Sequence, residues 1–143
     1  MSIWKTGTID LQKMIERSRG TLVEHLGIEY LEIGEDYVKA RMPVDERTRQ
    51  PMGILHGGAH VALAESIGSM AANLCLDTSK EYAVGLDINS NHIKSISSGW
   101  VTGIAKPIHL GSQTQVWEIK IYNEQEQLLN ITRLTMIVLQ HRL

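Results

Sequence analysis

The chain has 143 residues, enough to bury a core but too few for two domains of ordinary size, so we expect one domain over residues 1–143. Its 14 Lys and Arg residues nearly balance its 16 Asp and Glu residues. This balance argues against nucleic acid or a membrane surface as a partner. The single cysteine, Cys75, excludes intrachain disulfides and, with an N-terminus that lacks a signal pattern, predicts a cytoplasmic protein.

The N-terminal residues predict two short helices. Thr8 or Asp10 can cap a helix whose inward side chains include Met14 and Ile15, and a second helical turn covers residues 22–26.

Alternating and β-branched residues predict the strands. Residues 28–42 indicate a hairpin with its turn at residues 34–36, and a polar loop over residues 43–53 follows. Most of the second half of the chain consists of strand-like segments separated by turns: 83–96, 100–110, 114–123 and 128–139.

One long apolar segment, from about residue 57 to residue 76, predicts a helix. Small and aliphatic residues lie on every side of its helical wheel, so we expect it to be buried nearly all round, together with its one carboxylate, Glu65. Removing an ionised carboxylate from water is costly. Such a group is usually paired, protonated or used in chemistry, and the alternative to chemistry here is that Glu65 pairs with a buried His or Arg.

The order of these elements indicates the α+β class, with an antiparallel sheet wrapped around one long central helix. Such a sheet has exposed edges, so we expect the chain to pair with a second copy.

The helix carries groups suited to acyl transfer. Glu65 and Ser69 are four residues apart and lie on one helix face, with Gly57 about two turns nearer the N-terminus. Acyl transfer needs a nucleophile or general base, and a donor for the oxygen that gains negative charge. We expect Glu65 to supply the first and the Gly57 N–H the second, both acting on one substrate.

Three segments carry a resemblance to a known family: residues 50–58 (QPMGILHGG), 64–69 (AESIGS) and 85–92 (GLDINSNH). They resemble the hotdog-fold acyl-CoA thioesterases, most closely a bacterial aryl-CoA branch that includes 1,4-dihydroxy-2-naphthoyl-CoA thioesterases of menaquinone synthesis and proofreading thioesterases of siderophore synthesis. The resemblance extends from Trp4 to Leu139. It implies the hotdog fold and hydrolysis of an aromatic or medium-chain acyl-CoA without a cofactor.

The resemblance also implies roles for five residues. Glu65 is the catalytic carboxylate, as nucleophile or as general base, and the Gly57 N–H forms the oxyanion site. Gln50 helps to hold the carbonyl and Ser69 helps to place water or the intermediate. His56 orients the loop and the carbonyl; alternatively, it only caps neighbouring backbone groups.

Substrate contacts follow from the same resemblance. His92 and Lys94 match positions that line the entry of the CoA arm, and Gly111 and Ser112 match a loop on the same side. The alternative is a solvated strand end and an ordinary turn. The family's substrate channel lies between two subunits, so the resemblance implies a homodimer or homotetramer.

Other functions remain as alternatives. A zinc site is the first alternative, because His56 and His60 are four residues apart and Glu65 follows. The HExxH order is absent, however, and no further ligand lies at a suitable spacing. A hydroxyacyl-thioester dehydratase of the same fold would carry a GHFP-like segment, which the sequence lacks. A proofreading thioesterase that acts on an aryl carrier protein and a noncatalytic acyl-CoA-binding module remain open.

Overall fold

A computed structural model describes residues 1–142. The helices are α1 (Leu11–Arg17), α2 (Leu22–His25) and α3 (Gly57–Leu74). The strands are β1 (Glu29–Ile33), β2 (Val38–Pro43), β3 (Glu81–His92), β4 (Trp100–Leu110), β5 (Thr114–Tyr122) and β6 (Leu128–Gln140). None of the helices within the described residues is long and apolar enough to cross a membrane.

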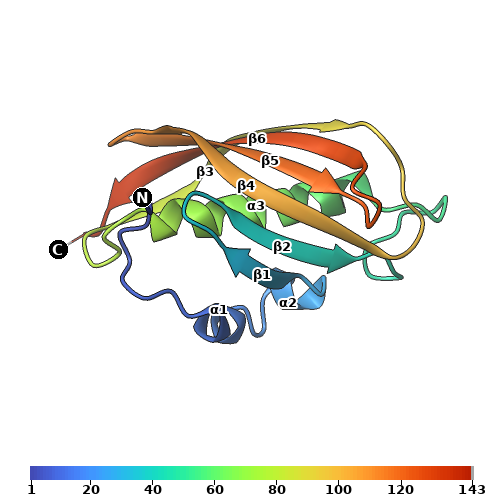
Figure 1. Cartoon of the computed structure of the whole chain (residues 1–143), viewed down its shortest axis with the longest axis horizontal. Coiled ribbons are helices and arrows are strands. Elements are labelled where there is room, and N and C mark those ends of the chain that lie inside the picture. Colours follow the sequence, from blue (N-terminus) through green and yellow to red (C-terminus); the bar gives the residue numbers. More distant parts are fainter. Residues whose placement is uncertain (143) are drawn as a thin grey trace.

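The strands form one antiparallel sheet in the order β1-β2-β4-β5-β6-β3. The sheet curls around α3, with β5 and β6 drawn above the helix and β1 below it (Figure 1). This arrangement confirms the predicted α+β class and the sheet wrapped around one helix. β1 and β3 are the edge strands.

The inner face of the sheet and one side of α3 share the core. Trp117, Ile119 and Ile121 alternate inward along β5 and are fully buried, as their period of two predicted. The helix approaches the sheet closely at Gly68, where an added Cβ would lie 2.6 Å from Leu134 Cδ2. A larger residue at position 68 would therefore force the fully buried Leu134 side chain to shift.

The predicted burial of α3 on nearly all sides is wrong. The sheet covers only one side of the helix, where Leu63, Ala64 and Ile67 are fully buried. The other side is a half-buried stripe made of Val61, Ala62, Glu65, Ser66, Ser69, Met70 and Asn73. An apolar helical wheel shows that a helix can be covered all round, but it does not show what covers each side.

Two helical details also differ from the prediction. α3 ends at Leu74 because the Cys75 N–H turns back to the Ala72 carbonyl. In α1, Met14 is buried but Ile15 is 43% exposed. Ile15 follows Met14 by about 100° around the helix axis, and only one side of this short helix meets the core.

The end of β3 differs for a tertiary reason. The prediction continued the strand to residue 96, whereas β3 ends at His92. Beyond that point the Ile96 carbonyl accepts the Leu55 N–H at 2.8 Å. Residue 96 therefore bonds to the loop that enters α3.

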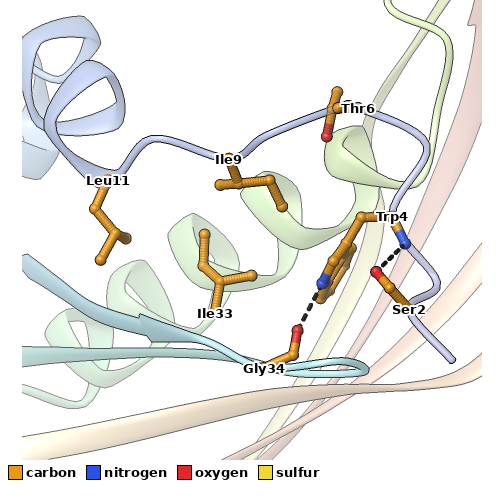
Figure 2. A pocket seen from close by; sticks show the side chains of 8 residues that line it. Ser2, Trp4, Thr6, Ile9, Leu11, Ile33 and Gly34 are labelled. Carbon is orange, nitrogen blue, oxygen red and sulfur yellow. Dashed lines mark hydrogen bonds between the residues drawn. The ribbon is translucent and has the colours of Figure 1, made fainter.

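The N-terminal segment packs against the core through Trp4 (Figure 2). Its indole lies parallel to that of Trp117 with ring centroids 6.4 Å apart, and its Nε1–H donates to the Gly34 carbonyl at 2.7 Å. A cavity of about 320 Å³ lies beside it, lined in part by Ile9 and Ile33. None of the described residues that line this cavity has a titratable side chain.

Candidate active site

A cleft of about 750 Å³ runs along the half-buried stripe of α3. Glu65 and Ser69 both line it, as expected for two residues on one helix face. Val23 borders the cleft from α2, and Tyr82 borders it from β3. The cleft therefore places a carboxylate and a hydroxyl where a small molecule can reach them.

The Glu65 carboxylate has neither a hydrogen bond nor an ion pair with any side chain in residues 1–142. The alternative in which it pairs with a buried His or Arg therefore does not describe this structure. Its Oε1 lies against β3 at Gly85, where an added Cβ would be only 2.5 Å away. Glu65 thus keeps its acceptor capacity for a ligand.

The first turn of α3 presents one free backbone donor. The Gly58 N–H donates to His56 Nδ1 at 2.8 Å, and the Ala59 and His60 N–H groups both reach the His56 carbonyl. In residues 1–142 the Gly57 N–H has no such acceptor. It lies at the positive end of the helix dipole, a position that favours an anionic oxygen.

His56 is the N-cap of α3, as one of its two expected roles required. Because its Nδ1 accepts a hydrogen bond, the neutral ring carries its proton on Nε2. Gln50 lies in the preceding loop, where its Oε1 accepts the Met52 N–H and leaves the amide NH₂ group as a donor.

The predicted catalytic residues form two groups in one copy of the chain. Gly57 and Glu65 are eight residues apart on α3, a separation of about 12 Å along the helix axis. One carbonyl group cannot contact both. Gln50, His56 and Gly57 lie at or before the start of the helix, while Glu65 and Ser69 lie in the cleft.

The predicted CoA contacts are also separated. His92 pairs with Asn130 on β6. Gly111 lies in the turn between β4 and β5, where its N–H donates to the Thr114 carbonyl. Thr114 pairs with Ile137, so the two regions are seven residues apart along β6, or about 23 Å. Lys94, just beyond β3, and Ser112, in the turn, are both exposed.

A reactive thiol and a metal site are two other possible sources of chemistry. Burial raises the pKa of the Cys75 thiol to about 11, so it remains a protonated thiol at neutral pH. Across residues 1–142, no three His, Cys, Asp or Glu side chains are placed to hold a metal ion.

Two residues that adjoin the site, Gly85 and Asn130, have no role in the prediction from sequence. Gly85 lies within the recognised segment 85–92, and its close approach to Glu65 explains why a glycine is present. Asn130 contacts His92 Nδ1 at 3.1 Å. No sequence signal could have shown this contact, because it depends on the pairing of β3 with β6.

Comparisons with known proteins agree with this geometry. Residues 52–130 match the model of the thioesterase superfamily. The chain is 48% identical to the 1,4-dihydroxy-2-naphthoyl-CoA hydrolase of Escherichia coli K12, over 96% of this chain and 99% of that one. It is also 48% identical to the proofreading thioesterase EntH of Cronobacter turicensis, over 96% and 98% of the two chains.

A solved thioesterase structure from Haemophilus influenzae superimposes with a TM-score of 0.93 at 48% identity, covering 96% of this chain and 95% of that one. The family match, the relatives and the shared architecture agree: the chain belongs to the thioesterase superfamily and is a thioester hydrolase with the hotdog fold.

Proposed function

We propose that the protein hydrolyses an aromatic acyl-CoA to the free acid and CoA, with Glu65 as the catalytic carboxylate. The observation that carries the proposal is the unpaired Glu65 carboxylate in an open cleft. Water supplies the OH of the product acid, the C–S bond breaks, and CoA leaves as the thiol. Glu65 attacks the carbonyl carbon itself or takes a proton from the attacking water.

The carbonyl oxygen gains negative charge in either route, so the site needs a preorganised donor. The Gly57 N–H fits this role because it has no acceptor among residues 1–142 and lies at the N-terminus of α3. The amide NH₂ of Gln50 supplies a further donor, and Ser69 places the water or the intermediate. We propose that no cofactor takes part, so activity should survive dialysis against EDTA.

We further propose that the working site lies between two copies of the chain. Within one copy, Gly57 and Glu65 are about 12 Å apart along α3. In the proposed dimer, Glu65 of one copy and Gly57 of the other act on the same carbonyl group. β3 offers an interface because it is an edge strand with exposed apolar side chains, among them Val84 and Leu86. The assembly is a homodimer, or a homotetramer built from two such dimers.

The substrate follows from the cleft and the relatives. A cleft of about 750 Å³ lies in the range that holds a drug-sized ligand. Tyr82 and Met70 give it apolar surface suited to an aromatic ring. The name of the E. coli relative supports 1,4-dihydroxy-2-naphthoyl-CoA, and that of the C. turicensis relative supports an aryl carrier protein thioester as the second candidate.

The CoA arm needs its own contacts. We propose that His92 and Lys94 of one copy and Gly111 and Ser112 of the other bind it. This pairing explains how two regions about 23 Å apart in one chain can line one entry.

The proposal is tested with purified wild type and the Glu65→Gln variant on hydroxynaphthoyl-CoA, benzoyl-CoA, straight-chain acyl-CoA and an aryl carrier protein thioester. We expect hydroxynaphthoyl-CoA to give the highest kcat/KM, and Glu65→Gln to lower kcat by about 10³-fold or more with an unchanged circular dichroism spectrum. Equal turnover by the two proteins would refute the role of Glu65. A preference for the carrier protein would favour the second candidate.

Mixing two inactive variants tests the shared site. Glu65→Gln and Gly57→Ala are each expected to be impaired, but a mixed dimer contains one site with neither defect. Activity should therefore rise when the two are unfolded and refolded together. If mixing gives only the average of the two variants, the site belongs to a single chain.

A further inference from the structure

A chain of polar side chains lies on the inner face of the sheet, behind the N-terminus of α3. Asn130 of β6 is fully buried, and its Nδ2 is 3.1 Å from His92 Nδ1 and 2.8 Å from Ser90 Oγ. The Thr132 hydroxyl donates to Asn130 Oδ1 at 2.7 Å and is 2.8 Å from Ser90 Oγ. Four side chains of two paired strands thus form one hydrogen-bond network.

Proton counting fixes the direction of these bonds. With Nδ2 toward Ser90 and His92, both amide protons of Asn130 have acceptors and Oδ1 accepts from Thr132. The flipped amide would leave only Thr132 near the NH₂ group, with one buried proton unpaired, which is costly. Asn130 therefore donates to His92 Nδ1, and the neutral ring must carry its proton on Nε2.

His92 Nε2 points at the start of α3. An added Cβ on Gly57 would lie 2.9 Å from it, so the Gly57 N and His92 Nε2 are within about 5.5 Å of each other. Two N–H donors at that separation can share one oxygen at ordinary hydrogen-bond distances. The absence of a side chain at Gly57 is what lets the ring come this close.

His60 closes the other side of this region. Its ring centroid lies 5.6 Å from that of His92, it is 96% buried, and its Nδ1 has no partner within residues 1–142. Burial, with a smaller effect of His92, lowers its pKa to about 4. His60 therefore stays neutral at physiological pH and places no positive charge beside His92.

We propose that His92 is a further catalytic residue, whose Nε2–H donates to the thioester carbonyl oxygen beside the Gly57 N–H, and that Asn130 is the positioning residue that fixes this tautomer. The inference rests on the proposed thioester hydrolysis and adds a donor to the Gly57 N–H and the Gln50 amide, with His92 lying where the CoA arm meets the thioester. Each donor matters because removal of one oxyanion donor typically costs 10² to 10³ in rate.

Asn130→Asp tests the tautomer, because a carboxylate can only accept a hydrogen bond. The proton of the neutral His92 ring should then move to Nδ1 and leave a bare Nε2 facing the oxyanion. We expect ¹⁵N NMR of the free protein to show protonated Nε2 in wild type and protonated Nδ1 in the variant. At pH 8 kcat should fall about 10- to 100-fold, the effect typical of losing a residue that orients a ligand-binding histidine.

The pH dependence of kcat distinguishes loss of the His92 tautomer from a general structural effect of the substitution. The new carboxylate favours the doubly protonated ring, which restores the Nε2–H, so Asn130→Asp should regain activity as the pH falls toward 6. Gln125→Glu is the control: the same change from amide to carboxylate, at an exposed residue of the turn between β5 and β6, should leave the rate and its pH profile unchanged.

Asn130→Asp places a charge at a buried position. Substitutions at His92, which is exposed, test the same donor without one. His92→Gln keeps an N–H donor and should stay within about 10-fold of wild type, whereas His92→Leu should lose about 10²-fold in kcat. Protonated Nδ1 in wild type, or equal rates for Gln and Leu, would overturn the inference while wild type remains active. A wild type that hydrolyses no thioester would instead overturn the proposed function, and with it the role of His92.

Discussion

The Glu65 carboxylate of α3 rests against Gly85 of β3, and the space it occupies exists only because residue 85 has no side chain. An added Cβ would lie 2.5 Å from Oε1 and 3.8 Å from Leu134 Cδ1. Of these two side chains, Glu65 lines the cleft, whereas Leu134 is fully buried. Gly85 therefore sets the direction in which Glu65 points.

Gly85→Ala should accordingly lower activity more than stability. We expect kcat to fall by about 10- to 100-fold, because the carboxylate is displaced from its attack position. The melting temperature should change little. Gly7→Ala is the control, since an added Cβ there has no atom within 4 Å. A Gly85→Ala enzyme with wild-type kcat would show that the position of Glu65 is not set by this contact.

Ser69→Ala should have a smaller effect than loss of the carboxylate. In the described part of the chain, the Ser69 hydroxyl has only Met136 Sδ as a partner, at 3.8 Å, so it keeps hydrogen-bonding capacity for water. We expect kcat to drop about 10- to 100-fold with little change in KM. Ser66→Ala is the matched control, because the Ser66 hydroxyl in the same cleft already donates to the Ala62 carbonyl at 2.6 Å. Similar rates for the two variants would remove Ser69 from the mechanism.

Local sequence patterns predict much of the fold. The features they do not predict depend on tertiary contacts. Alternation placed β4, β5 and β6, because each of these strands presents one face to the core. The end of β3 was missed because Ile96 bonds to a loop remote in sequence. The exposed side of α3 was missed because an apolar wheel does not reveal what covers it.

The candidate site shows the same division. A carboxylate within an apolar helix pointed to Glu65, and two glycines at the helix start pointed to Gly57. Their separation on one helix also follows from spacing alone, at 1.5 Å per residue. The link between His92 and Asn130 could not be found this way, since it requires the register of β3 on β6.

Leu86→Lys tests the proposed dimer and should give an inactive monomer. Leu86 is 59% exposed on the edge strand β3, and a buried charge at a paired edge opposes association. We expect light scattering to show monomers and kcat/KM to fall at least about 10²-fold, because the proposed site needs groups from both copies. Leu22→Lys, at a residue 60% exposed on α2, should change neither. A fully active monomer would contradict the shared site.

His60 should make the protein less stable in mild acid. Burial lowers its pKa from about 6.5 to about 4 in the folded chain, so between these values the unfolded chain binds more protons. The contribution of neutral His60 to the free energy of unfolding is fully present above pH 6.5. It is lost as the pH falls toward 4, and it amounts to about 3 kcal/mol. His60→Leu should remove this part of the pH dependence, whereas His25→Leu, at an exposed histidine, should retain it. Urea unfolding at pH 7.5 and 4.5 measures the difference, and an unchanged dependence in His60→Leu would show that His60 accepts its proton without unfolding.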